Sequence, residues 1–380
     1  MFCAFSAFGQ KTIQTEQDLL SFLSGKDELV DHVLKNREKY HLQIVYTGVH
    51  GAGDSLNFST IDLTTGQYFY PASMVKLPAA LLTLEKLNKL GLSRKDILKI
   101  NNDLHCGNQK FAELSRQRDI SFEEMIDELI VVSNNVYYNS LYHFLTPGEI
   151  NKSLAEKGLS ETHIYKSFTG CDIDEQLKCN SIEVRRGKDV VYQQELCVLD
   201  MGQMIKHYDY SDDKLLGAKH EYEREIVNGP YDFNYNLEMP LDEIHQMLMR
   251  LIYPEKFPEH ERWDLREEDR LYLIEVLQKY PRELGKKEFM NRENYPDNIY
   301  KYILIGEGNP KGIRTISKIG LSYGFSTETA YIHNESSDDF FLSISLYTNA
   351  NDIVNDGDYE YDELARPFMA RVAKLLSTVE

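Results

Sequence analysis

The sequence lacks the features that mark membrane, metal-binding and nucleic-acid-binding proteins. No apolar stretch is long enough to span a bilayer, so we predict no membrane insertion. Its 5 cysteines and 11 histidines follow no metal-ligand spacing, and we predict neither a metal ion nor a cofactor. Only 42 lysines and arginines stand against 61 aspartates and glutamates, and the net charge of −19 argues against a nucleic-acid partner. No internal repeat or low-complexity linker divides the 380 residues.

The strongest chemical signal is Ser73 followed three positions later by Lys76. Apolar residues then recur at helical spacing up to Gly91, at Leu77, Ala80, Leu81, Leu84 and Leu87. Residues three apart share a helix face, so the amine of Lys76 points back toward the hydroxyl of Ser73. A lysine in an apolar wall loses proton affinity and can act as a base near neutral pH. The same spacing recurs at Ser211 and Lys214, in a polar stretch that we predict to be a loop.

A second motif, Ser133-Asn134-Asn135, lies between two predicted helices. The first begins after Ser121, with Glu124 three residues later in a capping-box pattern, and the second covers 136–145. Side chains at such a junction can project into a cleft, although Ser and Asn are also common helix N-caps.

A third motif, Lys318-Ile319-Gly320, follows the β-branched stretch 313–317, which predicts a strand. A glycine beside a strand often marks the close approach of another backbone or a ligand. The same pattern at Lys89-Leu90-Gly91 is predicted to be only a helix end.

In this order the three motifs resemble those of the serine β-lactamase and penicillin-binding protein superfamily, Ser-x-x-Lys, Ser-x-Asn and Lys-Thr/Ser-Gly. Ser133 lies 60 residues after Ser73, close to the interval in class A β-lactamases, whereas Lys318 lies 185 residues further on, much later than in class A. The resemblance covers the chain from about residue 15 and implies one catalytic domain of two lobes, 15–380, with an insertion at about 172–238.

The resemblance implies a role for each motif residue. Ser73 would be the acylated nucleophile, Lys76 would help to activate it, and Ser133 would relay a proton to the leaving nitrogen. Asn135 would contact the substrate amide, and Lys318 would attract the substrate carboxylate. Gly320 and Leu321 would line the substrate, with the oxyanion hole formed by the backbone N–H groups of Ser73 and Leu321.

The implied activity is that of a serine acyl-enzyme hydrolase of the β-lactamase type, which hydrolyses a β-lactam or a related small-molecule or peptide amide. Three alternatives stay open: a D-alanyl-D-alanine peptidase-like enzyme acting on cell-wall peptides, a glutaminase-like amidase, and a ligand-binding module that has lost catalysis. The oligomeric state is not predicted.

Two departures from the family pattern affect this interpretation. Ile319 replaces the usual hydroxyl residue and cannot hydrogen-bond a carboxylate, for which Ser317 or Ser322 could substitute. The class A loop motif Glu-x-x-Leu-Asn, whose glutamate drives deacylation, has no match here. Candidates for that base are Asp172, Asp174 and Glu175, in what is otherwise a solvated loop. Without such a base the acyl-enzyme would be long-lived.

The predicted fold is α+β, with a mostly antiparallel sheet flanked by N- and C-terminal helices and an inserted all-helical lobe. We expect terminal helices at 17–34 and 361–376, and strands at 41–47, 58–63, 313–318, 329–333 and 341–348. Within the insertion, a hairpin that turns at 185–189 is predicted to shape the rim of the cleft.

The N-terminus and the cysteines bear on location. Residues 1–10 resemble part of a signal peptide, with small residues near Ala7, and favour a periplasmic or secreted protein over a cytoplasmic one. If Cys3 is removed, four cysteines permit two disulfides, and Cys171 and Cys179 are the closest pair in sequence; free thiols are the alternative.

Overall fold

The computed structural model describes residues 13–101, 103–104, 109–206, 208–303, 315–333 and 338–378. The predicted signal segment, together with Cys3 and Cys106, lies outside these ranges. Among the described residues, no helix has the length and apolar character needed to cross a membrane.

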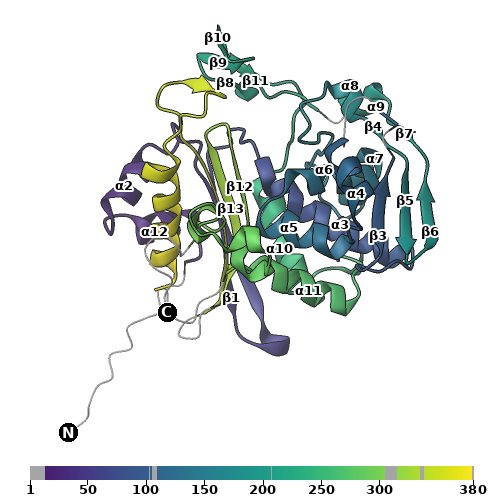
Figure 1. Cartoon of the computed structure of the whole chain (residues 1–380). Coiled ribbons are helices and arrows are strands. Elements are labelled where there is room, and N and C mark those ends of the chain that lie inside the picture. Colours follow the sequence, from purple (N-terminus) through teal and green to yellow (C-terminus); the bar gives the residue numbers. More distant parts are fainter. Residues whose placement is uncertain are drawn as a thin grey trace.

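The centre of the molecule is an antiparallel sheet of five strands in the order β12-β13-β14-β1-β2 (Figure 1). The first and last thirds of the chain build it together, because β1 pairs along its length with β14. Residues alternate between its two faces: Val45 packs in one core and Ile44 in the other. The strands are β1 (Gln43–His50), β2 (Asn57–Thr64), β12 (Thr315–Ser322), β13 (Phe325–Ile332) and β14 (Phe340–Tyr347).

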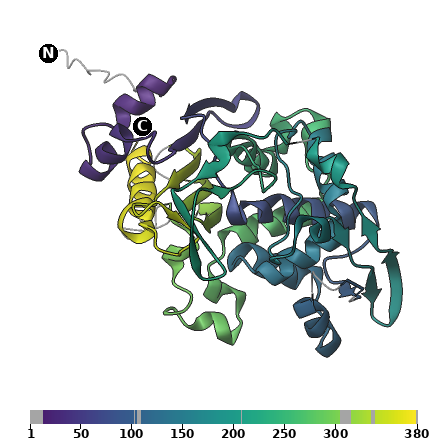
Figure 2. The ribbon, with the colours of Figure 1, turned by 90° about the horizontal axis from the view of Figure 1, so that it is seen from above.

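Helices from both chain ends cover one face of this sheet, as predicted (Figures 1 and 2). They are α1 (Glu16–Leu23), α2 (Glu28–Lys35) and α12 (Arg366–Leu376). The expected single helix at 17–34 is two helices, because Gly25 adopts a positive φ of 75° and Asp27 starts a new helix by accepting hydrogen bonds from Leu29 and Val30. The expected helix at 361–376 begins with a π-helical turn over Tyr361–Ala365.

The other face carries helix α10 and, beside it, a lobe built around the buried helix α3. Ser121 caps α5 as predicted, because its hydroxyl accepts a hydrogen bond from the N–H of Glu124 at 3.2 Å. The other half of the capping box does not form, since the Glu124 carboxylate accepts hydrogen bonds from Arg118 and Lys286 instead. Gly91 follows α3 with a positive φ of 65°, as expected. The helices are α3 (Lys76–Lys89), α4 (Gln109–Gln117), α5 (Phe122–Val131), α6 (Asn135–Leu145), α7 (Pro147–Glu156), α10 (Leu241–Ile252) and α11 (Glu267–Gln278).

The predicted lobe is not all-helical, because the segment 172–238 adds small sheets and short helices to it. Strands β3, β5 and β6 form one sheet, and β4 pairs with β7. Above the large sheet, β9 pairs with both β10 and β15, and β8 pairs with β11 (Figure 1). These elements are β3 (Ile97–Ile100), α8 (Ile173–Gln176), β4 (Lys178–Cys179), β5 (Ile182–Arg186), β6 (Asp189–Gln194), β7 (Cys197–Val198), α9 (Met201–Ile205), β8 (Leu215–Leu216), β9 (Lys219–Tyr222), β10 (Glu225–Asn228), β11 (Tyr231–Asp232) and β15 (Ile353–Val354).

The hairpin that turns at 185–189 exists, but its predicted place at the cleft rim is wrong. Arg186 donates hydrogen bonds to Asp96 and to the carbonyl of Gly91, just beyond the C-terminal end of α3. Ser73 precedes the opposite end of that 14-residue helix, which is about 20 Å long at 1.5 Å per residue. Both views show the hairpin at the outer edge of the helical lobe (Figures 1 and 2).

Candidate active site

Ser73 lies in a tight 3₁₀ turn, Ala72–Val75, that leads directly into α3. The N–H of Met74 closes the turn on the carbonyl of Pro71 at 2.9 Å. Ala72 has a positive φ of 47°, a strained conformation for a residue with a Cβ. The side chain of Ser73 keeps partial exposure, whereas its neighbours are buried. The turn thus presents one hydroxyl from an otherwise apolar wall.

The amine of Lys76 is the centre of the site. Its Nζ lies 2.9 Å from the Ser73 Oγ and 2.9 Å from the Ser133 Oγ, and it also contacts the Ser133 carbonyl and the Asn135 Oδ1 at 2.5 and 2.6 Å. The predicted meeting of Ser73 and Lys76 therefore occurs, and the second motif joins it. The whole Lys76 side chain is buried, with 0% of its surface exposed.

Burial sets the proton affinity of both site lysines. Desolvation holds the pKa of Lys76 well below its usual value, and the nearby charge of Lys318 lowers it further. Desolvation and the charge of Lys301 lower the pKa of Lys318 to about 7, against a smaller opposing effect of Glu328. A lowered pKa increases the fraction of an amine that is neutral at a given pH, and the neutral form can accept a proton from a hydroxyl.

The two interpretations of the motif Ser133-Asn134-Asn135, a helix N-cap and a cleft site, apply to different residues. Asn134 is the N-cap of α6, and its Oδ1 accepts hydrogen bonds from the N–H groups of Val136 and Tyr137. Ser133 stands before it with a positive φ of 55°, which turns its hydroxyl and its carbonyl toward Lys76. The capping interpretation therefore holds for Asn134, and the site interpretation holds for the residues on either side.

Lys318 reaches the same cluster from the large sheet. Its Nζ lies 3.3 Å from the Ser133 Oγ, so one hydroxyl connects the two lysines. Gly320 follows it on edge strand β12, and a Cβ built there would lie 2.4 Å from the Pro71 carbonyl oxygen. This close approach is the reason for glycine, as predicted, and it sets the next residue, Leu321, beside the Ser73 turn.

Ile319 points away from the cleft, because successive residues of a strand face opposite sides of a sheet. It is 6% exposed and packs in the core beneath the terminal helices. Ser317 faces the same way, and its hydroxyl accepts a hydrogen bond from buried Lys301 at 3.2 Å. Ser317 therefore does not replace the missing hydroxyl, whereas Ser322, on the Lys318 side of the strand, is partly exposed.

We expect the substitution Ile319→Thr to lower the free energy of unfolding by about 1–3 kcal/mol, because it places a hydroxyl in an apolar core. Urea unfolding measures the change, and Ile319→Val, which only removes a methylene group, should cost about 0.5–1.5 kcal/mol. A threonine variant that keeps full stability and gains acylation rate would contradict this placement of the side chain.

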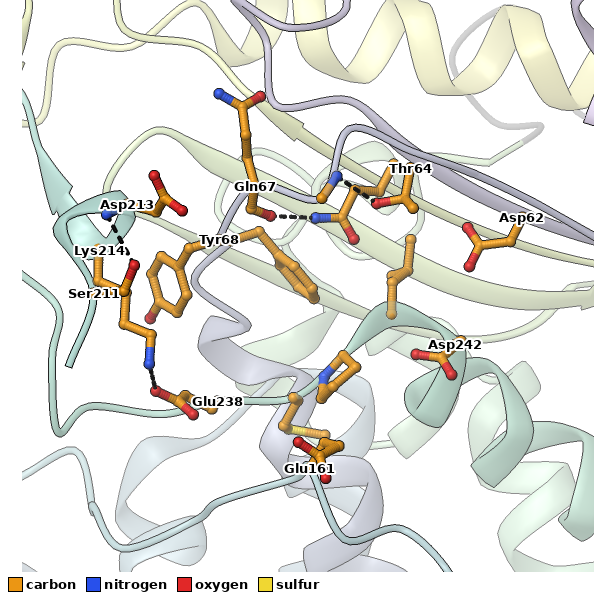
Figure 3. A pocket seen from close by; sticks show the side chains of 16 residues that line it. Asp62, Thr64, Gln67, Tyr68, Glu161, Ser211, Asp213, Lys214, Glu238 and Asp242 are labelled. Atoms are coloured by element: carbon orange, nitrogen blue, oxygen red, sulfur yellow. Dashed lines mark hydrogen bonds and ion pairs between the residues drawn. The ribbon is translucent and has the colours of Figure 1, made fainter. Parts of the chain in front are cut away.

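The repeated spacing at Ser211 and Lys214 produces no such site (Figure 3). The Lys214 amine contacts Glu238 and the carbonyl of Asp209, while the Ser211 hydroxyl accepts a hydrogen bond from the N–H of Asp213. This loop borders a separate acidic cavity of 420 Å³, lined in part by Asp62, Glu161, Asp213, Glu238 and Asp242. Serine and lysine at this spacing form a pair only when a buried helix start aligns them.

The three candidate bases after residue 170 make no contact with the catalytic cluster. Asp172 and Asp174 are exposed, and Glu175 forms an ion pair with Lys178 at 2.5 Å. Among the described residues, no carboxylate contacts Ser73, Lys76 or Ser133. The expectation that one of these carboxylates serves as the deacylating base therefore has no geometric support.

Two residues of the site were missed from the sequence, Phe168 and Asn139. The Phe168 ring centroid lies 5.3 Å from the Lys76 Nζ. Asn139 holds the backbone of Phe168 on both sides, accepting from its N–H at 2.8 Å and donating to its carbonyl at 3.3 Å. Asn139 lies one helical turn after Asn135, so the helical period could have identified it, but no local pattern marks Phe168.

The described cysteines combine the two alternatives, because one of them is disulfide-bonded and two are free thiols. Cys171 is disulfide-bonded, whereas Cys179 and Cys197 are free thiols that face each other across β4 and β7. Cys171 and Cys179 therefore do not pair. Hydrogen bonding from Cys179 lowers the pKa of the Cys197 thiol to about 7, against desolvation, which raises it.

Comparisons with known proteins agree with this fold. Residues 31–207 match the family described as the Beta-lactamase enzyme family. The TLA-3 extended-spectrum β-lactamase superimposes with a TM-score of 0.53 and 14% identity, over 93% of this chain and 98% of that one. A β-lactamase from Burkholderia ambifaria gives 0.54 and 14%, over 93% and 100%. A PBP-A mutant, solved as an acyl-enzyme complex with penicillin G, gives 0.53 and 12%, over 95% and 97%. A comparison with curated proteins found no match.

Proposed function

We propose that this chain is a member of the serine β-lactamase and penicillin-binding protein superfamily, and that Ser73 forms an acyl-enzyme with a β-lactam or a related amide. The observation that carries the proposal is the buried Lys76 amine between the hydroxyls of Ser73 and Ser133, at 2.9 Å from each. A nucleophile and a base within hydrogen-bond reach are the minimum for nucleophilic catalysis.

The steps follow from the contacts. The neutral Lys76 amine accepts the Ser73 proton, and the Ser73 Oγ attacks the amide carbonyl carbon. The N–H groups of Ser73 and Leu321 stabilise the oxyanion. As the C–N bond breaks, the Ser133 hydroxyl gives its proton to the leaving nitrogen and recovers one from Lys76. Protonated Lys318 attracts the carboxylate of the substrate, and the Asn135 side chain contacts the substrate amide.

The intact cluster argues against a binding module that has lost catalysis. A buried lysine is costly to keep, since desolvation penalises its charged form. Lys76 also hydrogen-bonds the carbonyl and hydroxyl of Ser133 and the Oδ1 of Asn135. This arrangement requires the strained positive φ of Ser133. Such strain is concentrated at functional sites, and a module that only binds has no use for a depressed lysine pKa.

A second candidate is a D-alanyl-D-alanine peptidase-like enzyme, which uses the same acylation on a cell-wall peptide. One observation favours it: among the described residues, no carboxylate contacts Ser73, Lys76 or Ser133, where it could drive rapid hydrolysis of a β-lactam ester. The two candidates share the acyl-enzyme and differ in the substrate that forms it.

Labelling with a fluorescent penicillin tests the proposal. We expect a covalent adduct on Ser73, located by peptide mass mapping, which disappears in Ser73→Ala and persists in Ser211→Ala. Rapid nitrocefin turnover would then favour a β-lactamase, and release of D-alanine from a peptide ending in D-alanyl-D-alanine would favour the peptidase. Absence of both labelling and D-alanine release would refute acylation of this substrate class.

We also propose that the protein is exported to the periplasm or secreted. The apolar segment 1–10 supports this, and so does the disulfide at Cys171, because disulfides persist in oxidising compartments. Fractionation of cells that express the full chain, followed by N-terminal sequencing of the mature protein, tests the location.

A further inference from the structure

The free thiols of Cys179 and Cys197 stand opposite each other on two short strands of the segment 172–238. They are direct partners in the antiparallel pairing of β4 with β7 (Figure 1). Directly opposite residues of such a pair have Cα atoms about 4.5–5.5 Å apart, and their side chains leave the same face of the sheet. A disulfide spans Cα atoms about 4.4–6.8 Å apart. The backbone therefore already holds the two thiols within bonding range.

The ladder that joins β4 to β7 is short. It consists of two residue pairs, and one further hydrogen bond joins the N–H of Leu199 to the carbonyl of Leu177 at 2.9 Å. Val198 on β7 is 62% exposed and contributes little packing. Because an isolated two-stranded pair is marginal at best in water, a covalent bond between these strands would add much of their stability.

The two thiols differ in access and in proton affinity. Cys179 is buried, with 0% of its surface exposed, whereas Cys197 is partly exposed. The hydrogen bond between them raises the pKa of Cys179, and burial raises it further. The same hydrogen bond lowers the pKa of Cys197 to about 7. The more accessible thiol is therefore also the one that ionises more readily, and the thiolate is the form that attacks a disulfide.

Strand β4 also supports a loop beside the catalytic cluster. Gln176, two residues before β4, accepts a hydrogen bond from the N–H of Ser167 at 2.6 Å. Its carbonyl accepts a second one from the Tyr142 hydroxyl of α6 at 3.0 Å. Ser167 precedes Phe168, whose ring centroid lies 5.3 Å from the Lys76 Nζ. A bond between β4 and β7 would therefore anchor the segment that holds this loop.

We propose that Cys179 and Cys197 form a stabilising disulfide that joins β4 to β7 when the protein meets a disulfide-bonded oxidant. The Cys197 thiolate attacks one sulfur of the oxidant and releases the other as a thiol. Cys179 then loses its proton and attacks the Cys197 Sγ, which releases the second thiol. Two protein thiols are oxidised, and one disulfide of the oxidant is reduced to two thiols.

The proposal agrees with the state of the remaining described cysteine. Cys171 is disulfide-bonded, so the fold already contains one bond of the kind that oxidising compartments maintain. The new bond is independent of the proposed acylation of Ser73, because neither reaction uses a group of the other.

Peptide mapping of the full-length protein tests the proposal. The protein is treated with glutathione disulfide, free thiols are trapped with N-ethylmaleimide under denaturing conditions, and the digest is analysed without reduction. We expect the natural protein to yield a linked pair of peptides that contain Cys179 and Cys197. In Cys179→Ser the reaction should stop at a glutathione adduct on Cys197, whereas in Cys197→Ser the buried Cys179 should stay largely unmodified.

Thermal unfolding measures what the bond does for the fold. The two cysteines lie 18 positions apart, and a bond across a loop of this length restricts the unfolded chain. We expect the linked natural protein to have a Tm about 5 °C higher than the unlinked protein, with the Cys171 disulfide intact in both by the same peptide map. Cys197→Ser, given the same two treatments, should show no shift.

Two results would overturn the inference. Free thiols that persist at both positions after complete treatment of the natural protein would show that β4 and β7 do not hold them in bonding range. A linked protein whose Tm equals that of the unlinked protein would remove the stabilising role. Labelling of Ser73 by a penicillin is scored separately, so its failure would leave this inference standing.

Discussion

Replacement of Lys76 by methionine is expected to slow the acylation of Ser73 by about 10²- to 10⁴-fold, the usual contribution of a positioned general base. The physical reason is local: Lys76 Nζ is the only described group that hydrogen-bonds the Ser73 Oγ, at 2.9 Å. Stopped-flow or quenched mass spectrometry with penicillin G measures the rate. Acylation of Lys76→Met at the natural rate would show that the base lies elsewhere.

The matched control for this variant is Lys214→Met. Lys214 has the same spacing from Ser211 as Lys76 has from Ser73, but its amine contacts Glu238 and the Asp209 carbonyl. We expect its removal to leave acylation within about twofold of the natural rate, because the change lies outside the catalytic cluster.

The same Lys76→Met substitution is expected to stabilise the fold. The folded-state pKa of Lys76 is depressed by burial, whereas the unfolded chain binds the proton up to about pH 10.4. The unfolded state therefore binds more protons, and the natural protein gains stability as pH rises through this window. The stability advantage of Lys76→Met should therefore be largest at the acid end of this window and shrink as pH rises toward about 10, which urea unfolding at several pH values can measure.

The efficiency of acylation by carboxylate substrates is expected to fall as pH rises above about 7, the pKa that burial and the charge of Lys301 give to Lys318. Below this pH the amine is protonated and attracts the substrate carboxylate; above it the charge is lost. A charge-assisted hydrogen bond contributes about 1.5–3 kcal/mol, so the expected loss is roughly ten- to hundredfold. Second-order acylation rates between pH 6 and 9 report this pKa for the free enzyme.

The groups that face Lys318 set the sign of this effect. Desolvation and the charge of buried Lys301, on the segment before β12, lower the pKa of Lys318, while buried Glu328 on β13 raises it. The amine of Lys76 is the neighbouring titratable group, since both lysines contact the Ser133 hydroxyl. Protonation of Lys76 at lower pH removes the base, so the acid limb and the alkaline limb together should give a bell-shaped profile.

Two controls identify the alkaline limb with Lys318. In Lys318→Arg the charge persists at every pH tested, so the decline above pH 7 should vanish. A penicillin methyl ester carries no carboxylate and should show no such decline with the natural protein. An alkaline limb of the same size with the ester would assign the titration to another group.

Much of the site could be predicted because its parts are local in sequence. Ser73 and Lys76 are one helical turn apart, and Gly320 stands where β12 meets another backbone, so spacing and residue type were sufficient. The strands and most helices followed from apolar periodicity for the same reason.

The features that were missed depend on contacts between distant segments. Phe168 belongs to the site only because Asn139 holds its backbone, and the 185–189 hairpin leaves the cleft because β5 pairs with β3, more than 80 residues earlier. Lys301 and Glu328 meet behind Lys318 only after β12 and β13 have paired. Local periodicity carries no signal for such pairings.

The pairing of β1 with β14 has a consequence for how the protein is made. Almost 300 residues separate these strands. During synthesis the edge of β1 that pairs with β14 therefore stays unpaired until the last strands have left the ribosome. Helices α3, α5 and α6 complete their contacts within a much shorter stretch of chain and can assemble first. The nascent protein therefore exposes an unsatisfied strand edge for most of its translation, which is the period when a holding chaperone would be of most use to it.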